Sequence, residues 1–191
     1  MLSTINANFK TNLSQTIITD FRNTADMIDK FGGVNLHIDK GIHQYVNRYI
    51  DEQASLKGIS LLPLTRTENI KMTGDQALAY ARVRVAGTMY NDQSRVERQK
   101  DVTKAVLNFA IQHKTQAARY FYDLWSLIDT DISFSVFWDI CKTFLNKHKI
   151  PKSQVFPNYQ AYTNERIPNV GLVLKLKDFR KVSVELNSMI N

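Results

Sequence analysis

The segment TIITDFRNTADMIDKFGGVNLHI, Thr16 to Ile38, changes its hydrophobic period twice, and this limits the folds open to the chain. A short apolar run at Thr16 to Ile18 comes first. Apolar residues then recur at helical spacing in FRNTADMIDK, and the Gly-Gly pair that follows supplies a helix stop. Val34 to Ile38 alternates strictly between apolar and polar residues, as a half-buried strand does. This order of strand, helix and strand predicts an α/β fold with a mixed, partly parallel central sheet flanked by helices.

Beyond this segment, helical patterns dominate. Thr73 and Gln76 have the spacing of a capping box, which predicts a helix start before Ala77 to Tyr80. From Ala81 the segment ARVRV alternates with period two and is expected to be extended. Further helices are expected at His43 to Leu56, Asp92 to about His113, Gln116 to Ile128, Phe134 to Lys147 and Lys181 to Ile190, short strands at Gln154 to Phe156 and Gly171 to Leu176, and an irregular stretch at Pro63 to Met72.

The chain of 191 residues contains no internal repeat and no Gly- or Pro-rich linker, so it is interpreted as one domain, 1–191. It carries 25 Lys and Arg against 18 Asp and Glu, a net charge of +7. This surplus favours an anionic partner, which could be nucleic acid, an anionic membrane surface or a phosphorylated ligand. No signal peptide and no transmembrane segment is expected in this chain.

Four arginines follow one another between Ala77 and Gln99, where only two carboxylates are present. In the helix that begins at Asp92, Arg98 lies beside an expected buried face. Four residues share that face: Arg95, Gln99, Val102 and Val106. A buried arginine needs a partner, because an uncompensated buried charge costs several kcal/mol.

In the ARVRV segment, Arg82 and Arg84 point the same way if the chain is extended, while Val83 and Val85 face the core. A short loop joins this segment to the helix that carries Arg95, so the four guanidinium groups can converge. Guanidinium groups near a helix N-terminus suit a phosphate, which they bind with two hydrogen bonds each.

A simpler interpretation of these arginines remains open. Each one could be solvated, or it could pair with an acid such as Asp75, Asp92 or Glu97, as most arginines do. The spacing alone does not decide between an anion site and surface ion pairs.

Two motifs of this chain resemble the signature of the LytR-CpsA-Psr family. The first is MTGDQALAYARVR, Met72 to Arg84, followed by D-x-x-R-x-x-R-Q, which begins at Asp92. The second is IITDFRNTADMIDKFGGVNLHID, and TINANFKTNLS resembles the segment that precedes it in the family. The resemblance covers Thr4 to about Phe109, and more loosely the C-terminal third.

The resemblance implies a mixed sheet flanked by helices, with a lipid tail in an apolar tunnel. It implies a membrane-anchored phosphotransferase on the outer face of mainly Gram-positive bacteria. Such enzymes move teichoic acid, capsule or similar glycopolymers from polyprenyl pyrophosphate to peptidoglycan. By motif position, the residues expected to bind the pyrophosphate are Arg82, Arg84, Arg95, Arg98 and Gln99. Asp92 and Arg95 are the expected catalytic residues, with Asp92 orienting an arginine or transferring a proton.

The chain also departs from the family pattern. From the resemblance we expect the N-terminal portion of the family domain to lie outside this sequence. That portion is expected to carry the N-terminal strands, the membrane anchor, the acids that hold Mg²⁺ and a further arginine. We therefore expect no metal site in this chain, and expect it to be catalytically incomplete alone. Gln93 stands where the family usually has an aromatic residue, and VAGTMYN, Val85 to Asn91, differs from the usual segment.

Other classes of function have weaker support. The four histidines show no metal-ligand spacing, and Cys141, in the apolar run FWDICKTFL, is expected to be a buried thiol. The main alternative is a basic transcriptional regulator that binds nucleic acid. It rests on the net charge alone, because the sequence contains no recognisable DNA-binding motif. We therefore expect no nucleic-acid partner. A protein that binds phosphate without turnover is a third possibility.

Overall fold

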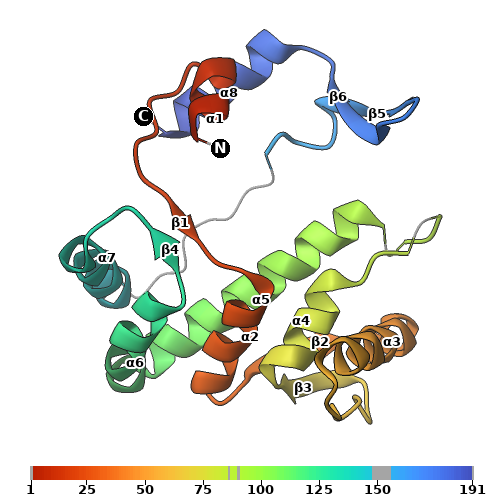
Figure 1. Cartoon of the computed structure of the whole chain (residues 1–191), viewed down its shortest axis with the longest axis vertical. Coiled ribbons are helices and arrows are strands. Elements are labelled where there is room, and N and C mark those ends of the chain that lie inside the picture. Colours follow the sequence, from red (N-terminus) through yellow and green to blue (C-terminus); the bar gives the residue numbers. More distant parts are fainter. Residues whose placement is uncertain (1, 86, 90, 148–155, 191) are drawn as a thin grey trace. The chain divides into compact units, whose positions relative to one another are not determined.

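The computed structural model describes residues 2–85, 87–89, 91–147 and 156–190. It divides into two compact units, one of Ile17–Pro151 and one of Met1–Thr16 with Lys152–Asn191 (Figure 1). The expectation of a single domain stays a prediction. The elements are α1 (Leu2–Phe9), β1 (Ile17–Ile18), α2 (Phe21–Lys30), β2 (Val34–Ile38), α3 (Lys40–Lys57), β3 (Glu68–Met72), α4 (Gly74–Arg82), α5 (Asp92–Gln112), α6 (Lys114–Ser126), β4 (Asp129–Thr130), α7 (Phe134–Lys147), β5 (Tyr162–Ile167), β6 (Gly171–Leu176) and α8 (Phe179–Ile190).

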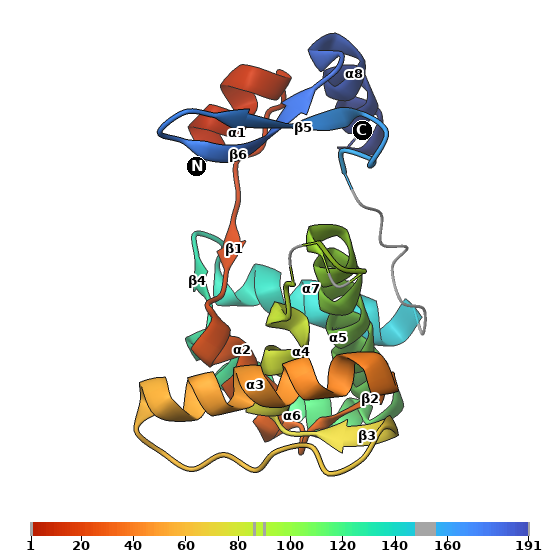
Figure 2. The same ribbon diagram turned by 90° about the vertical axis from the view of Figure 1, so that its right-hand side faces the viewer.

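Helix α4 lies at the centre of the larger unit, in contact with α2, α3, α5 and the two-stranded β2–β3 sheet (Figure 2). The three alanines of its ALAYA sequence are buried, which lets neighbouring helices approach closely. The core around it takes Ile42, Val46 and Ile50 from one face of α3 and alternate residues from β2. Because α4 is enclosed, the chain segment that leaves its C-terminus has a fixed starting point.

A second core lies between α5, α6 and α7 and is rich in aromatic side chains. Phe121 is buried and makes an edge-to-face contact with Trp138, with ring centroids 5.4 Å apart. Phe31, at the end of α2, stacks on Phe109 of α5 at 5.1 Å. Val106 of α5 packs against both cores. One helix therefore contributes to both parts of the hydrophobic interior.

The α/β class is confirmed, but the strands are arranged differently from the expected central sheet. In the described part of the chain they form three two-stranded antiparallel sheets, β1–β4, β2–β3 and β5–β6. Strand β2 pairs with β3 along its whole length, from Val34 opposite Met72 to Ile38 opposite Glu68. β1 pairs instead with β4, so no parallel pair forms between β1 and β2.

Most helix predictions are confirmed, with shifted ends. The strand at β3 was missed, because only Ile70 and Met72 are apolar and buried in ENIKM and its pairing partner lies far away in sequence. α4 continues through Arg82, so the extended segment starts later than expected, at Val83. The strand expected at Gln154 to Phe156 lies, except for Phe156, outside the described residues. Elements α1, β4 and β5 were not predicted.

The start of α4 is held by three polar contacts and a very close approach to α2. Thr73 and Gln76 form the predicted capping box, and the Gly74 backbone N–H donates to the Asp29 carboxylate at 2.7 Å. A Cβ at Gly74 would lie 2.0 Å from the Ala25 carbonyl oxygen. Only glycine lets the two helix backbones approach this closely.

In the smaller unit, Phe9 at the end of α1 joins this helix to α8. Its ring stacks on Phe179, with centroids 5.2 Å apart. Its carbonyl oxygen accepts hydrogen bonds from the Ser183 hydroxyl at 2.7 Å and the Asn187 side chain at 2.8 Å. The hydroxyl and the amide therefore satisfy a carbonyl at the C-terminal end of α1.

Candidate anion-binding site

Three of the predicted arginines gather where α4 ends and α5 begins. Asp92, in the first turn of α5, contacts Arg84 and Arg95 with its two carboxylate oxygens. The Nη2–Oδ2 distance to Arg84 is 2.5 Å, and the Nη2–Oδ1 distance to Arg95 is 2.7 Å. All three side chains are between one third and one half exposed. One carboxylate therefore holds two guanidinium groups side by side at a helix N-terminus.

Helix α5 begins where the sequence indicated, because its first turn satisfies its own backbone. The Asn91 side chain accepts from the backbone N–H groups of Gln93 at 3.0 Å and Ser94 at 3.2 Å. Asp92 adds a negative charge at the positive end of the helix dipole. This local geometry fixes the direction in which Asp92 and Arg95 leave the helix.

Arg82, the last residue of α4, contacts Tyr49 and Glu52 of α3. The guanidinium carbon of Arg82 is 5.7 Å from the Tyr49 ring centroid, and its Nη2 is 3.8 Å from Glu52. The Tyr49 hydroxyl also accepts from the Arg84 backbone N–H at 3.3 Å and contacts the Arg84 carbonyl oxygen at 3.4 Å. Tyr49 thus contacts two of the three arginines, and sequence reasoning missed it because it lies 35 positions before Arg84.

Arg98 has a different place from the one expected. Its side chain is 5% exposed, its Nε–H donates to the Tyr80 carbonyl at 3.1 Å, and its Nη2 donates to the Val83 carbonyl. Arg98 therefore satisfies carbonyl groups at the C-terminal end of α4, where helix carbonyls have no intrahelical partner. Its expected contact with pyrophosphate stays a prediction, and its observed contacts are structural.

The buried face of α5 was predicted only in part. Arg98, Val102 and Ala110 are buried, whereas Gln99 is exposed and Arg95 is half-buried. Val102 was predicted correctly, and Val106 is partly buried. Arg98 is buried because it packs against the C-terminal end of α4. A helical wheel of α5 alone carries no information about this contact between two helices. Gln99 still lies one turn after Arg95, within the same N-terminal part of α5.

One hydrogen-bond donor of the Arg95 guanidinium is unpaired within the described residues. Its Nε is buried and has no hydrogen-bond partner within the described part of the chain. Buried donors are nearly always satisfied, so a donor left unpaired at a cluster of cations calls for an explanation. An anion bound between the arginines is one explanation.

The tyrosine below this site has a strongly shifted pKa. Burial raises the pKa of Tyr80 to about 12, and the nearby Asp101 carboxylate acts in the same direction. Tyr80 therefore keeps its proton throughout the physiological range and is part of the core, not of the acid–base chemistry.

Metal binding and membrane spanning find no support in the part of the chain that the structure describes. No three His, Cys, Asp or Glu side chains there lie close enough together to hold a metal ion. No helix among the same residues is long and apolar enough to cross a bilayer. The Mg²⁺ expectation stays a prediction.

Comparison with protein families identifies the chain. The model of the LytR_cpsA_psr family matches residues 1–180. The chain therefore belongs to the LytR_cpsA_psr family, as its motifs predicted. No curated protein matches its sequence significantly.

Solved structures share the fold. Lin1025 from Listeria innocua has a TM-score of 0.65 at 17% identity, covering 98% of this chain and 73% of that protein. EF0465 from Enterococcus faecalis, described as a transcriptional regulator, has a TM-score of 0.62 at 20% identity, with 98% and 63% covered. TagT from Bacillus subtilis has a TM-score of 0.63 at 18% identity, with 97% and 64% covered. TagT has also been solved bound to LI-WTA. This chain thus spans less than two thirds of the length of TagT and of EF0465.

Proposed function

We propose that this chain carries the pyrophosphate-binding part of a cell-wall glycopolymer transferase. Arg84 and Arg95 would bind the pyrophosphate of a polyprenyl-linked glycopolymer, such as a teichoic acid or capsule precursor, with Arg82 and Gln99 beside them. The acceptor would be peptidoglycan. Membership of the LytR_cpsA_psr family and the likeness to TagT support this proposal.

The observation that carries the proposal is the Asp92 carboxylate between the two arginines. Asp92 makes one ion-pair contact with each arginine, through separate oxygens, and the oxygens of a phosphate group would suit the same two guanidinium groups. An incoming pyrophosphate, with more charge than a carboxylate, would displace it. The arginines would then neutralise charge on the transferred group, which is the main requirement of phosphoryl transfer.

The proposed reaction transfers a glycan phosphate to a sugar hydroxyl. The hydroxyl oxygen attacks the phosphorus next to the glycan, the bond from that phosphorus to the bridging oxygen breaks, and polyprenyl phosphate leaves. The hydroxyl proton goes to a base, and the displaced Asp92 carboxylate is the residue we assign to that role. Mg²⁺, if bound, would add positive charge at the pyrophosphate. We propose that the reaction takes place at the outer face of the membrane, which family membership supports.

Calorimetric titration of a short-chain polyprenyl pyrophosphate, with and without Mg²⁺, tests the proposal. We expect saturable binding to the unaltered chain, weakened by about 1.5–3 kcal/mol in Arg95→Ala, the scale of a hydrogen bond to a charged group. Arg180→Ala, at an exposed arginine of the smaller unit, is the matched control and should bind as before. Equal losses in both variants would show that only net charge is sensed, and would contradict the proposal.

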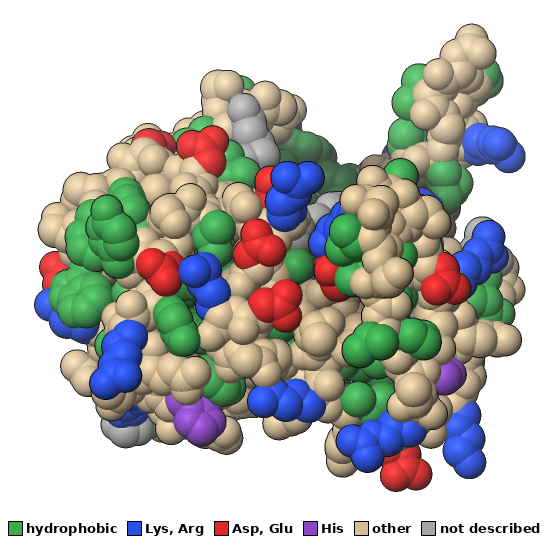
Figure 3. Space-filling model, turned by 60° about the horizontal axis from the view of Figure 1, so that its bottom comes forward, with side chains coloured by type: hydrophobic (Ala, Val, Ile, Leu, Met, Phe, Trp, Pro, Cys, Tyr) green, Lys and Arg blue, Asp and Glu red, His purple; other side chains and the backbone are tan. Residues whose placement is uncertain are grey.

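The alternative is a nucleic-acid-binding regulator, which the net charge of +7 and the description of EF0465 favour. On the face shown in Figure 3, however, the described Lys and Arg side chains are interspersed with Asp and Glu and form no continuous stripe. A titration with duplex DNA at increasing salt separates the two functions. Tight binding with a steep salt dependence, unaffected by Arg95→Ala, would favour the regulator.

A further inference from the structure

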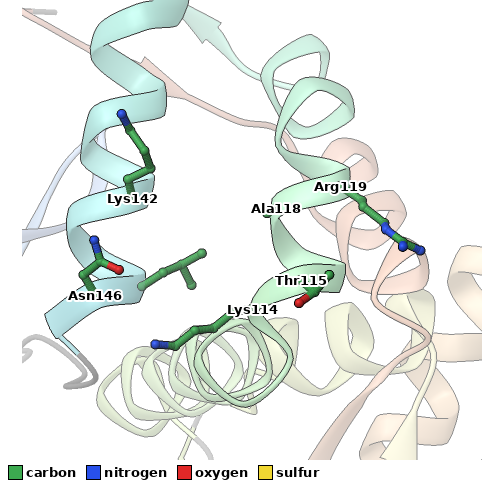
Figure 4. Close-up of a pocket in the computed structure, with 7 residues that line it drawn as sticks. Lys114, Thr115, Ala118, Arg119, Lys142 and Asn146 are labelled. Carbon is green, nitrogen blue, oxygen red and sulfur yellow. The ribbon is translucent and has the colours of Figure 1, made fainter.

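A pocket of about 560 Å³ opens between α6 and α7, and cationic side chains line it (Figure 4). The side chains of Lys114 and Lys142, on facing helices, do not converge on one point. The guanidinium groups of Arg84 and Arg95, by contrast, both lie against the Asp92 carboxylate. Several cations on one wall therefore do not make a convergent site by themselves, and the arginine site depends on the groups that hold its cations in place.

Asp92 cannot be the group that holds Arg84 while a ligand is bound. In the proposed function an anion displaces the Asp92 carboxylate, so the Arg84 guanidinium then loses its ion-pair partner. The Arg84 side chain is 48% exposed, and ordering such a side chain on a ligand weakens binding through lost conformational freedom. Contacts to the Arg84 backbone reduce this cost, because they persist when Asp92 moves away.

The hydroxyl of Tyr49, on α3, makes these backbone contacts. It accepts a hydrogen bond from the Arg84 N–H at 3.3 Å and donates one to the Arg84 carbonyl oxygen at 3.4 Å. A phenolic hydroxyl both donates and accepts, so one group serves both. In an extended segment the side chain stands roughly at a right angle to the backbone hydrogen bonds. Holding the N–H and C=O toward α3 therefore fixes the direction in which the Arg84 side chain leaves the chain.

Two further contacts hold the same part of the chain. Arg98 of α5 donates to the carbonyl oxygen of Val83, the residue before Arg84. The Tyr49 ring also faces the guanidinium of Arg82, whose carbon lies 5.7 Å from the ring centroid. Helices α3 and α5 thus hold two successive residues after α4 through one side chain each, and Tyr49 alone among these groups contacts both Arg82 and Arg84.

We propose that Tyr49 is a positioning residue of the anion site, which keeps Arg84 in place for a pyrophosphate group while Asp92 is displaced. This inference rests on the proposed function of the arginine site. The hydroxyl fixes the Arg84 backbone, and the ring supports the Arg82 side chain. Tyr49 acts on the ligand through these two arginines.

Calorimetric titration of inorganic pyrophosphate into the full chain and two variants tests this role. Tyr49→Phe keeps the ring and removes the hydroxyl, whereas Tyr49→Leu removes both. Because the two hydrogen bonds are long, we expect the affinity to fall only about threefold in Tyr49→Phe. The lost ring contact should bring the fall to about tenfold in Tyr49→Leu. The Arg84 backbone amide should exchange faster with deuterated solvent in both variants, because the hydroxyl no longer protects it.

Tyr120→Phe and Tyr120→Leu are the matched controls. Tyr120 is a half-buried tyrosine of α6 that packs in the aromatic core against Phe31. Its variants should leave the pyrophosphate affinity and the exchange of the Arg84 amide unchanged. Urea denaturation gives the stability of all four variants, and Tyr49→Phe carries the test if Tyr49→Leu does not fold. Equal losses of affinity in the Tyr49 and Tyr120 variants would overturn the inference.

The outcomes separate this inference from the proposed function. Unchanged affinity in both Tyr49 variants, together with weaker binding by Arg95→Ala, would overturn the positioning role and leave the proposed function standing. Full affinity in Tyr49→Phe would likewise exclude the hydroxyl as the group that holds Arg84. An unaltered chain that binds no pyrophosphate would contradict both the inference and the proposed function.

Discussion

Asp92 binds the Arg84 guanidinium across the loop that separates α4 from α5, at an Nη2–Oδ2 distance of 2.5 Å. The contact joins the segment that follows the C-terminus of α4 to the first turn of α5. The same carboxylate also holds Arg95 at 2.7 Å, so it neutralises part of the charge that an anionic ligand would meet. Asp92 is therefore an internal competitor for the site that it helps to shape.

The variant Asp92→Asn should bind inorganic pyrophosphate more tightly than the unaltered chain. Removing the competing charge frees two guanidinium groups. Because all three side chains are partly exposed and screened, we expect a gain of roughly three- to tenfold in affinity. Isothermal titration calorimetry at constant ionic strength measures it.

Glu165→Gln is the control for this gain, since it makes the same charge change on β5, where Glu165 pairs with Lys175. It should leave the pyrophosphate affinity unchanged. Weaker binding by Asp92→Asn would mean that the carboxylate is needed to align the arginines, which would contradict its role as a competitor.

Arg98→Met should lower the free energy of unfolding by roughly 2–4 kcal/mol, because it leaves buried carbonyls of Tyr80 and Val83 without a donor. Arg98→Lys keeps the charge but loses the forked geometry, so we expect an intermediate value. Urea denaturation measures both. The exposed Arg84→Met is the comparison, with an expected cost below about 1 kcal/mol. An Arg98→Met variant no less stable than Arg84→Met would refute the structural role.

Gly74→Ala should destabilise the chain by roughly 3 kcal/mol or more, because the new Cβ would overlap the Ala25 backbone and force α2 and α4 apart. Gly58→Ala separates this overlap from backbone strain. Gly58 has a φ of +66°, and a Cβ placed there would meet no atom within 4 Å. Its replacement should therefore cost only about 1 kcal/mol. Thermal and urea unfolding of both variants give the comparison, and equal costs would exclude the overlap.

Cys141 should react slowly with thiol reagents at neutral pH. Burial raises the pKa of its thiol from 9.0 to about 11, and the thiolate is the reactive form. The labelling rate should therefore rise mainly above about pH 10, and addition of urea should bring it to that of an exposed cysteine. A midpoint near pH 9.0, the ordinary value, in the folded chain would contradict this assignment.

The same shift makes stability depend on pH. The unfolded chain loses the thiol proton at lower pH than the folded chain, so the unfolded state binds fewer protons between about pH 9 and 11. The contribution of Cys141 to the free energy of unfolding is therefore complete below about pH 9 and decreases across that window. Cys141→Ala should not show this part of the decrease.

Helix starts could be predicted from the sequence because their signals are local. Thr73 with Gln76 caps α4, and Asn91 caps α5 just before the first-turn acid Asp92, each within one turn of the groups that it satisfies. Strand β3 could not be predicted in the same way. Its ENIKM sequence becomes a strand through pairing with β2, whose residues lie 30 to 38 positions earlier, and that contact is tertiary.

The candidate site was predicted in part. The motif named Arg84, Asp92 and Arg95, and the structure brings these three together. It also named Arg98, whose contacts with α4 depend on how two helices pack. Tyr49 carried no signal at all, because an aromatic residue inside a helix is more often core than support for an arginine.

Val106 belongs to both hydrophobic cores, and this has a consequence for how the larger unit unfolds. Neither core can unfold locally without disturbing α5, so local unfolding of one core lowers the stability of the other. The two cores should therefore melt as one cooperative block. The backbone amides around Val106 should be the last to exchange with deuterated solvent.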